Sequence, residues 1–305
     1  MQFANNDATP FINYNVAVGF ESLRGSTSAA ANTGTNNTAI GYRTLWSNTS
    51  GSRNSANAVE ALFSNTTGSS NTANGFDALY SNTSGSYNTA IGDEALYSNV
   101  GGSYATAIGY YAMYNANNTA TPFTNYNVAL GYEALRGSSS PANNIGNYNS
   151  AIGYQALQNN SNGNYNIATG YQALKSNSSG TGNSAYGAYA LGSNSNGNNN
   201  MAMGYTALLY NISGNDNTAV GISALTNNQN GNENTAIGSG AMLNNVNSSY
   251  NTAVGRQALN NSTSQYNTAV GYNAALTTSS GFNNVSLGAY SLINNTTGSY
   301  HTSWR

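Results

Sequence analysis

Few residues of this 305-residue chain have the side-chain chemistry of a catalytic site. His301 is the only histidine, so a histidine-based nucleophilic triad would depend on one residue near the end of the sequence. We interpret His301 as a replacement for a repeated Asn. Asp93 and Glu94 form the only adjacent carboxylate pair, and cysteine is absent. We therefore predict a non-enzymatic protein without catalytic, cofactor-binding or metal-binding residues.

Asn-x-Ser/Thr triplets are a second chemical signal, because they are acceptors for N-glycosylation in secreted proteins. Several of them fall at the same place in a polar turn, although any turn rich in Asn, Ser and Thr would produce such triplets. The candidate glycosylation sites are Asn48, Asn65, Asn82, Asn177 and Asn211.

Charge is scarce, which excludes some partners. Charged residues make up 5% of the chain, the net charge is -2, and the seven Lys and Arg residues form no basic patch. Nucleic-acid binding is therefore not expected. No apolar run approaches the ~20 residues of a membrane span, so we expect no membrane insertion within this segment. The first residues lack the basic and apolar regions of a signal peptide.

One motif organises the chain: Asn-Thr-Ala-Ile/Val-Gly-Tyr-x-Ala-Leu, followed by a polar turn. Most copies follow one another at a spacing of 17 residues, which is too short for a helical repeat. The Gly- and Asn-rich turns favour short strands. We therefore predict an all-β fold, a parallel β-solenoid of about 16 coils, continuous over residues 1–305. The copies centre on Gly19, Gly41, Ala58, Gly75, Gly92, Gly109, Gly131, Gly153, Gly170, Gly187, Gly204, Gly221, Gly238, Gly255, Gly271 and Gly288.

Constant positions within the motif predict the interior of each coil. Ala two residues before the Gly, the Gly itself and Leu four residues after it are expected to be buried. The Ala-Leu segment is expected to form a second short strand or an extended bend. The residue before the Gly is more variable, as expected of a face toward a partner chain or partial solvent. The core candidates are Ala39, Gly41, Leu45, Ala90, Gly92, Leu96, Ala151, Gly153, Leu157, Ala219, Gly221 and Leu225.

Asn and Tyr also recur at fixed offsets. Asn four residues before the Gly predicts a ladder of side chains that hydrogen-bond from coil to coil. Tyr five residues before the Gly, or one after it, predicts stacked rings with a structural role. The candidate ladder residues are Asn88, Asn149, Asn217 and Asn251.

A higher-order repeat lies over the basic one, since residues 8–41 match residues 120–153. The extra residues of these longer copies lie in turns, which tolerate insertions, and are expected to bulge from one side of the stack. If two copies of the sequence were placed head to tail, the 17-residue repeat would continue nearly in phase from one copy into the next. Met1, Phe3, Trp304 and Arg305 are therefore candidates for an end-to-end contact between copies.

The copies Asn88-Thr-Ala-Ile-Gly92 and Asn149-Ser-Ala-Ile-Gly153 resemble the head repeats of YadA-like trimeric autotransporter adhesins and related fibre proteins. The resemblance covers essentially the whole chain, although the repeat is longer here than is usual in that family. It implies a trimer of left-handed parallel β-rolls that projects from a cell and binds host matrix or other surfaces.

These observations predict an extracellular or cell-surface structural fibre or adhesin segment that displays polar Asn, Ser, Thr and Tyr turns. Its expected partners are further copies of the chain, as a trimer or an end-to-end polymer, and a surface glycan or matrix ligand. No cofactor is expected. The alternatives are a subunit of a self-assembling extracellular filament and a glycan-binding shaft of a phage or viral fibre. Ice binding is less favoured, because Ser, Val or Ile often replaces the Thr after the repeat Asn.

Overall fold

The structure, a computed structural model, describes residues 13–305. The predicted fold class is confirmed: the chain is a parallel β-solenoid of about 16 turns with a 17-residue repeat, and residues 13–305 contain no α-helix. The chain divides into two compact units, Met1–Gln155 and Ala156–Arg305, which we describe separately. Met1, Phe3 and the start of the predicted repeat 8–41 lie outside the described residues.

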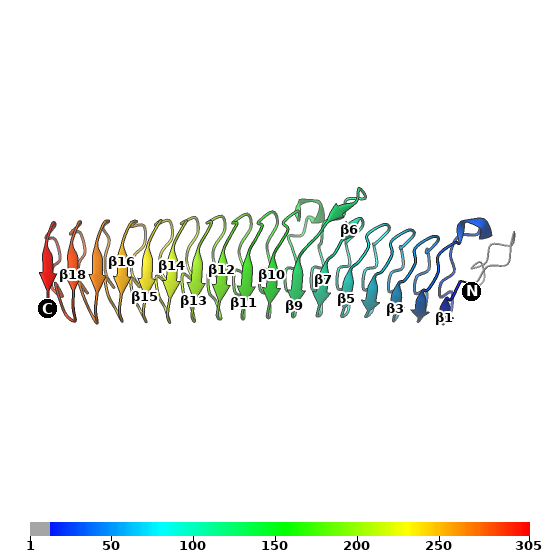
Figure 1. The fold of residues 1–305 in the computed structure, drawn as a ribbon, viewed down its shortest axis with the longest axis horizontal. Coiled ribbons are helices and arrows are strands. Elements are labelled where there is room, and N and C mark those ends of the chain that lie inside the picture. The colour runs from blue at the N-terminus through cyan, green and yellow to red at the C-terminus, as the bar shows by residue number, and fades with distance from the viewer. Residues whose placement is uncertain (1–12) are drawn as a thin grey trace. The chain divides into compact units, whose positions relative to one another are not determined.

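In the first unit, successive three-residue strands pair in parallel with equivalent residues opposite one another (Figure 1). Ala90 of one coil thus lies opposite Ala107 of the next. The strands of this sheet are β1 (Val16–Val18), β2 (Thr38–Ile40), β3 (Ser55–Asn57), β4 (Thr72–Asn74), β5 (Thr89–Ile91), β7 (Thr106–Ile108), β9 (Val128–Leu130) and β10 (Ser150–Ile152).

The second unit repeats the same arrangement with nine strands of three residues, each paired in parallel with the next. Ala219 of β14, for example, lies opposite Ala236 of β15. The strands are β11 (Ile167–Thr169), β12 (Ser184–Tyr186), β13 (Met201–Met203), β14 (Thr218–Val220), β15 (Thr235–Ile237), β16 (Thr252–Val254), β17 (Thr268–Val270), β18 (Val285–Leu287) and β19 (Thr302–Trp304).

Strand geometry explains why the interior is built of small residues. Successive side chains of a strand point to opposite faces, so the central Ala of each strand points into the coil while its two neighbours point outward. Ala90 and Ala219 are fully buried, whereas Ile91 is 38% exposed. Leu from the far side of the coil fills the remaining interior, and Leu45, Leu96, Leu157 and Leu225 are all fully buried.

The Ala-Leu segment is not a second strand or an extended bend, and that expectation is wrong. Residues 93–98 form consecutive turns, in which Glu94 and Leu96 both have a φ of 55°. Ala95 and Leu96 are both fully buried. A strand would point two successive side chains to opposite faces, so only a turning backbone places both in the interior. The backbone still bonds between coils, because Leu96 N donates to Ala112 O at 3.0 Å.

The motif glycine stands where the strand enters these turns. Gly221 has a φ of 131°, a region that residues with a side chain rarely adopt. A Cβ atom on Gly221 would lie 2.7 Å from the carbonyl carbon of Gly238 in the next coil. Conformation and coil spacing therefore both favour glycine. Ala58 is the one alanine at this position, and it adopts the same unusual conformation with a φ of 121°.

The longer copies of the first unit place their extra residues in turns, as predicted. Figure 1 shows the segment around β6 standing out from the regular turns. Asn32 closes one long turn by accepting from Ser26 N at 2.8 Å, and Asn144 closes the equivalent turn by accepting from Ser138 N at 3.0 Å. The elements of these turns are η1 (Ala29–Ala31), η2 (Pro141–Asn143) and the parallel pair β6 (Gly102–Ser103) and β8 (Phe123–Thr124).

Candidate interaction surface

The residue before each motif glycine forms a row on the outside of each sheet, which we call the outer row. Its members point away from the interior because they flank the buried Ala of each strand. Most apolar members remain exposed, as shown by Ile40 (42%), Met203 (46%) and Ile237 (39%). The outer row comprises Val18, Ile40, Asn57, Asn74, Ile91, Ile108, Leu130 and Ile152 in the first unit, and Thr169, Tyr186, Met203, Val220, Ile237, Val254, Val270, Leu287 and Trp304 in the second.

The Asn four residues before each glycine forms a buried ladder. Asn217 donates through Nδ2 to Asn200 Oδ1 at 3.1 Å and through its backbone N to the same oxygen at 3.0 Å. Among the other candidates, Asn88 N donates to Asn71 Oδ1 at 2.9 Å. The remaining two residues make the same kind of bond: Asn149 N to Asn127 Oδ1 at 2.8 Å and Asn251 N to Asn234 Oδ1 at 3.1 Å.

A second Asn ladder, seven residues after the Gly position in most copies, was not predicted from the sequence. Asn65 Nδ2 donates to Asn48 Oδ1 at 2.7 Å, and Asn82 Nδ2 donates to Asn65 Oδ1 at 2.8 Å. The two ladders meet at turn carbonyls. Gly214 O, for example, accepts from Asn200 Nδ2 at 2.8 Å and from Asn211 Nδ2 at 2.9 Å.

This second ladder corrects the interpretation of the glycosylation candidates. Asn48 is 4% exposed, and Asn65, Asn82, Asn177 and Asn211 are fully buried. Their amide nitrogens donate within the coil stack, as Asn177 Nδ2 does to Asn160 Oδ1 at 2.8 Å and Gly180 O at 3.0 Å. A glycan attaches to this nitrogen, so the folded coil has no room for one. The Asn-x-Ser/Thr pattern here reflects a structural ladder.

The ladders have interruptions. Ala105 and Ala116 replace both ladder Asn residues in the coil of Gly109. The buried Oδ1 of Asn99 consequently has no hydrogen-bond donor. Ala105 N still donates to Asn88 Oδ1 at 2.9 Å, so the backbone part of the first ladder continues through this coil.

Aromatic rings form stacked rows on the surface. The predicted Tyr row five residues before the glycine includes Tyr87 and Tyr104, whose ring centroids lie 5.1 Å apart. A further row, five residues after the glycine, was not predicted and occurs in the first unit. Its neighbouring rings lie 5.1–5.2 Å apart, in the order Trp46, Phe63, Tyr80, Tyr97 and Tyr114.

Charged side chains lie beside this unpredicted aromatic row. We call them the charged row, which comprises Glu21, Arg43, Glu60, Asp77 and Glu94. Arg43 bridges two carboxylates, with Nε 3.4 Å from Glu21 Oε2 and Nη1 3.3 Å from Glu60 Oε1. Asp77 follows in the next coil. Burial, and then the neighbouring charges of Glu60 and Glu94, raise the pKa of Asp77 from 3.8 to about 6.

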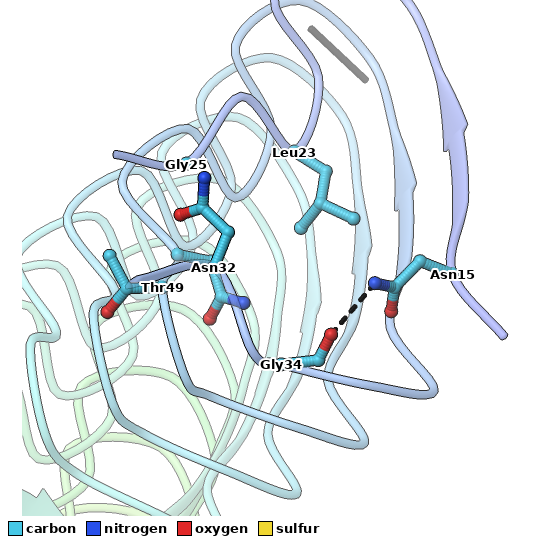
Figure 2. A pocket seen from close by; sticks show the side chains of 7 residues that line it. Asn15, Leu23, Gly25, Asn32, Gly34 and Thr49 are labelled. Atoms are coloured by element: carbon cyan, nitrogen blue, oxygen red, sulfur yellow. Dashed lines mark hydrogen bonds between the residues drawn. The ribbon is translucent and has the colours of Figure 1, made fainter. Parts of the chain in front are cut away.

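Two surface hollows of residues 13–305 are small. Figure 2 shows one in the first coil, with Leu23 and Asn15 on its lining and Asn15 Nδ2 donating to Gly34 O at 2.9 Å. Its volume of about 10 Å³ suits one water molecule. An open hollow of about 220 Å³ in the second unit is lined by Val246, Thr263 and Gln265, among others. Both are below the ~300–1,000 Å³ of typical small-molecule sites.

His301 belongs to the second unit, whereas the adjacent pair Asp93 and Glu94 belongs to the first. His301 takes the place of a ladder Asn, and its backbone N donates to Asn284 Oδ1 at 3.0 Å. The exposed Asp93 accepts from Phe76 N at 3.2 Å, and Glu94 belongs to the charged row. Within residues 13–305, no group of three or more His, Cys, Asp or Glu side chains could hold a metal ion. No helix in this range is long and apolar enough to cross a membrane.

Of the residues considered for an end-to-end contact, two are described. Trp304 ends the outer row of the second unit on β19 and is 79% exposed. Arg305 N donates to Leu287 O at 2.9 Å, which continues the pairing of β18 with β19. Comparisons of the sequence with family models and with curated proteins find no match.

Proposed function

We propose that this chain is a structural segment of an extracellular fibre or adhesin and that it associates with further copies of itself through the outer row. The observation that carries the proposal is the exposure of in-register apolar side chains along each sheet. Contiguous apolar surface of this kind is uncommon on monomeric proteins and is typical of interaction sites.

The periodicity of the outer row supports association between copies. Strands repeat about every 4.8 Å, so a row on one chain meets an equivalent row on a second chain with the same spacing. Each coil would then add one more contact of the same kind. Identical surfaces that pair in this way produce closed symmetric oligomers. The resemblance of the repeats to those of trimeric adhesins supports a trimer and an extracellular location.

The test is the mass of the native protein by sedimentation velocity. We expect an oligomer for the wild type and a shift to single chains for the double variant Ile237→Lys/Val270→Lys, because it places charges on the apolar row. Both positions are more than a third exposed, so the coil tolerates the longer side chains. The matched control is Asn196→Lys, on an exposed turn of the same unit. A wild type that sediments as single chains at every concentration would refute the proposal.

A second candidate function is glycan binding by the turns. The observation that favours it is the exposure of Tyr87 (53%), Tyr104 (46%) and Tyr148 (48%) close to polar turns. Tyrosine combines an apolar ring face with a hydroxyl that hydrogen-bonds. A glycan array probed with the wild type and with Tyr104→Ala tests this candidate: it predicts binding that weakens in the variant, and an array without signal contradicts it.

A further inference from the structure

The tyrosines five residues before the motif glycine have an arrangement suited to covalent chemistry. In the first unit, Tyr87, Tyr104, Tyr126 and Tyr148 stack in sequence with centroid distances of 5.1, 5.4 and 5.2 Å. In the second unit, Tyr250 and Tyr266 stack at 5.1 Å with their planes 3° apart. All six rings are 43–54% exposed. A soluble oxidant can therefore reach them.

The backbone fixes the direction of these rings. Tyr87, Tyr104, Tyr250 and Tyr266 all have a φ between 61° and 72°. The backbone N–H groups of Tyr87, Tyr104 and Tyr250 bond to neighbouring coils, as Tyr104 N does to Ser86 O at 3.0 Å. Equivalent backbone conformations place equivalent ring carbons opposite one another in successive coils. Two phenol rings are thus held together before any reaction, which is the main entropic requirement for coupling them.

We propose that these in-register tyrosines are sites of oxidative coupling to dityrosine, with hydrogen peroxide and a peroxidase-type one-electron oxidant as co-reactants. The coupling would join neighbouring coils of one chain covalently.

The reaction balances as follows. Each of two phenols loses one electron to the oxidant and one proton, which gives two phenoxyl radicals with spin density on the ring carbons ortho to oxygen. The ortho carbons of the two rings form a C–C bond. The hydrogen on each coupled carbon then moves to the phenoxyl oxygen, which restores both aromatic phenols. The two electrons and two protons reduce one hydrogen peroxide to two waters.

Such a bond would oppose the local unfolding to which a solenoid is prone. Each coil contacts only its neighbours, so unfolding can begin at any poorly held coil and spread. The chain has no cysteine, so disulfides cannot join its coils. A bond between Tyr250 and Tyr266 would connect two coils that are otherwise held by hydrogen bonds and side-chain packing. This inference does not depend on association between chains.

The experiment treats the purified full chain with hydrogen peroxide and a haem peroxidase, then maps cross-linked peptides by mass spectrometry. We expect Tyr250 to be linked to Tyr266 within one chain, with the loss of two hydrogen atoms, at a yield independent of protein concentration. Treated protein should also unfold at a higher urea concentration. Tyr266→Phe keeps the ring and should abolish this cross-link.

The control is Tyr210→Phe. Tyr210 is 50% exposed and does not stack on another ring within residues 13–305, so its replacement should leave the cross-link map unchanged. The proposal is overturned if Tyr250 couples as readily to Tyr210 as to Tyr266, or if only links between chains form. It is also overturned if urea-unfolded chains give the same intramolecular yield of the Tyr250–Tyr266 link.

Discussion

Replacement of Asn200 by alanine tests the ladder that holds the coils together. Asn200 is 1% exposed, and its Oδ1 accepts from both Asn217 N (3.0 Å) and Asn217 Nδ2 (3.1 Å). Its Nδ2 donates to Asn183 Oδ1 at 3.1 Å and to Gly214 O at 2.8 Å. One side chain thus bonds the coil before it and the coil after it.

The magnitude follows from what the substitution leaves unpaired. Asn217 N–H loses its acceptor, whereas Gly214 O keeps the bond from Asn211 Nδ2 and Asn183 Oδ1 keeps the bond from Asn200 N. A buried donor without a partner costs about 1–3 kcal/mol, and each lost bond adds about 0.5–1.5 kcal/mol. One unpaired donor and three other lost bonds together predict that Asn200→Ala destabilises the protein by about 2.5–7.5 kcal/mol.

The assay is urea unfolding followed by circular dichroism, together with hydrogen exchange at the Asn217 amide, which should exchange faster in the variant. Asn196→Ala is the matched control, because Asn196 belongs to the same unit and has an exposed side chain. It should change stability by less than about 0.5 kcal/mol. Equal effects of the two substitutions would refute the assignment of the buried Asn ladder as a stabilising connection between coils.

Three further predictions concern the interior, the backbone and the charged row. Leu208→Ala should destabilise the protein by about 2–5 kcal/mol in urea unfolding, because Leu208 is fully buried; a loss below 1 kcal/mol would contradict this packing. Ala58→Gly should stabilise it by about 1 kcal/mol in the same assay, because the φ of 121° strains alanine; a destabilised variant would contradict the strain. The pKa of Asp77 is raised to about 6, so its contribution favours folding at low pH and is lost as the pH rises from about 4 through 6. Asp77→Asn should flatten that pH dependence and, since the carboxyl is only partly buried and solvent screens its charge, stabilise the protein at neutral pH by only about 0.5–1 kcal/mol; an unchanged pH profile would contradict the shift.

The sequence predicts the solenoid because identical units must bury the same positions. Ala90 and Leu96 recur in almost every copy, and the period of 17 residues leaves no alternative to a short coil. The conformation of the Ala-Leu segment could not be predicted in the same way. Glu94 and Leu96 adopt a positive φ, for which neither residue type has a preference. The packing of the coil, rather than local propensity, therefore determines this conformation.

The surface was predicted less completely. The second Asn ladder could have been predicted, since Asn65 and Asn82 recur at a constant offset from the Gly position. The Asn-x-Ser/Thr triplets were instead interpreted as N-glycosylation sites. The aromatic row from Trp46 to Tyr114 lies five residues after the Gly position in only a few consecutive coils. A motif derived from all copies of the repeat therefore does not contain it. The raised pKa of Asp77 depends first on burial and then on the carboxylates of Glu60 and Glu94, each of which lies 17 residues away in sequence.

The most direct test of the central claim is an electron cryomicroscopy structure of the native purified protein. The account predicts that chains contact one another through the outer row, with side chains such as Ile237 and Val270 buried against another copy. Single chains with these side chains exposed to solvent, or an assembly whose contacts all lie on the turns, would contradict it.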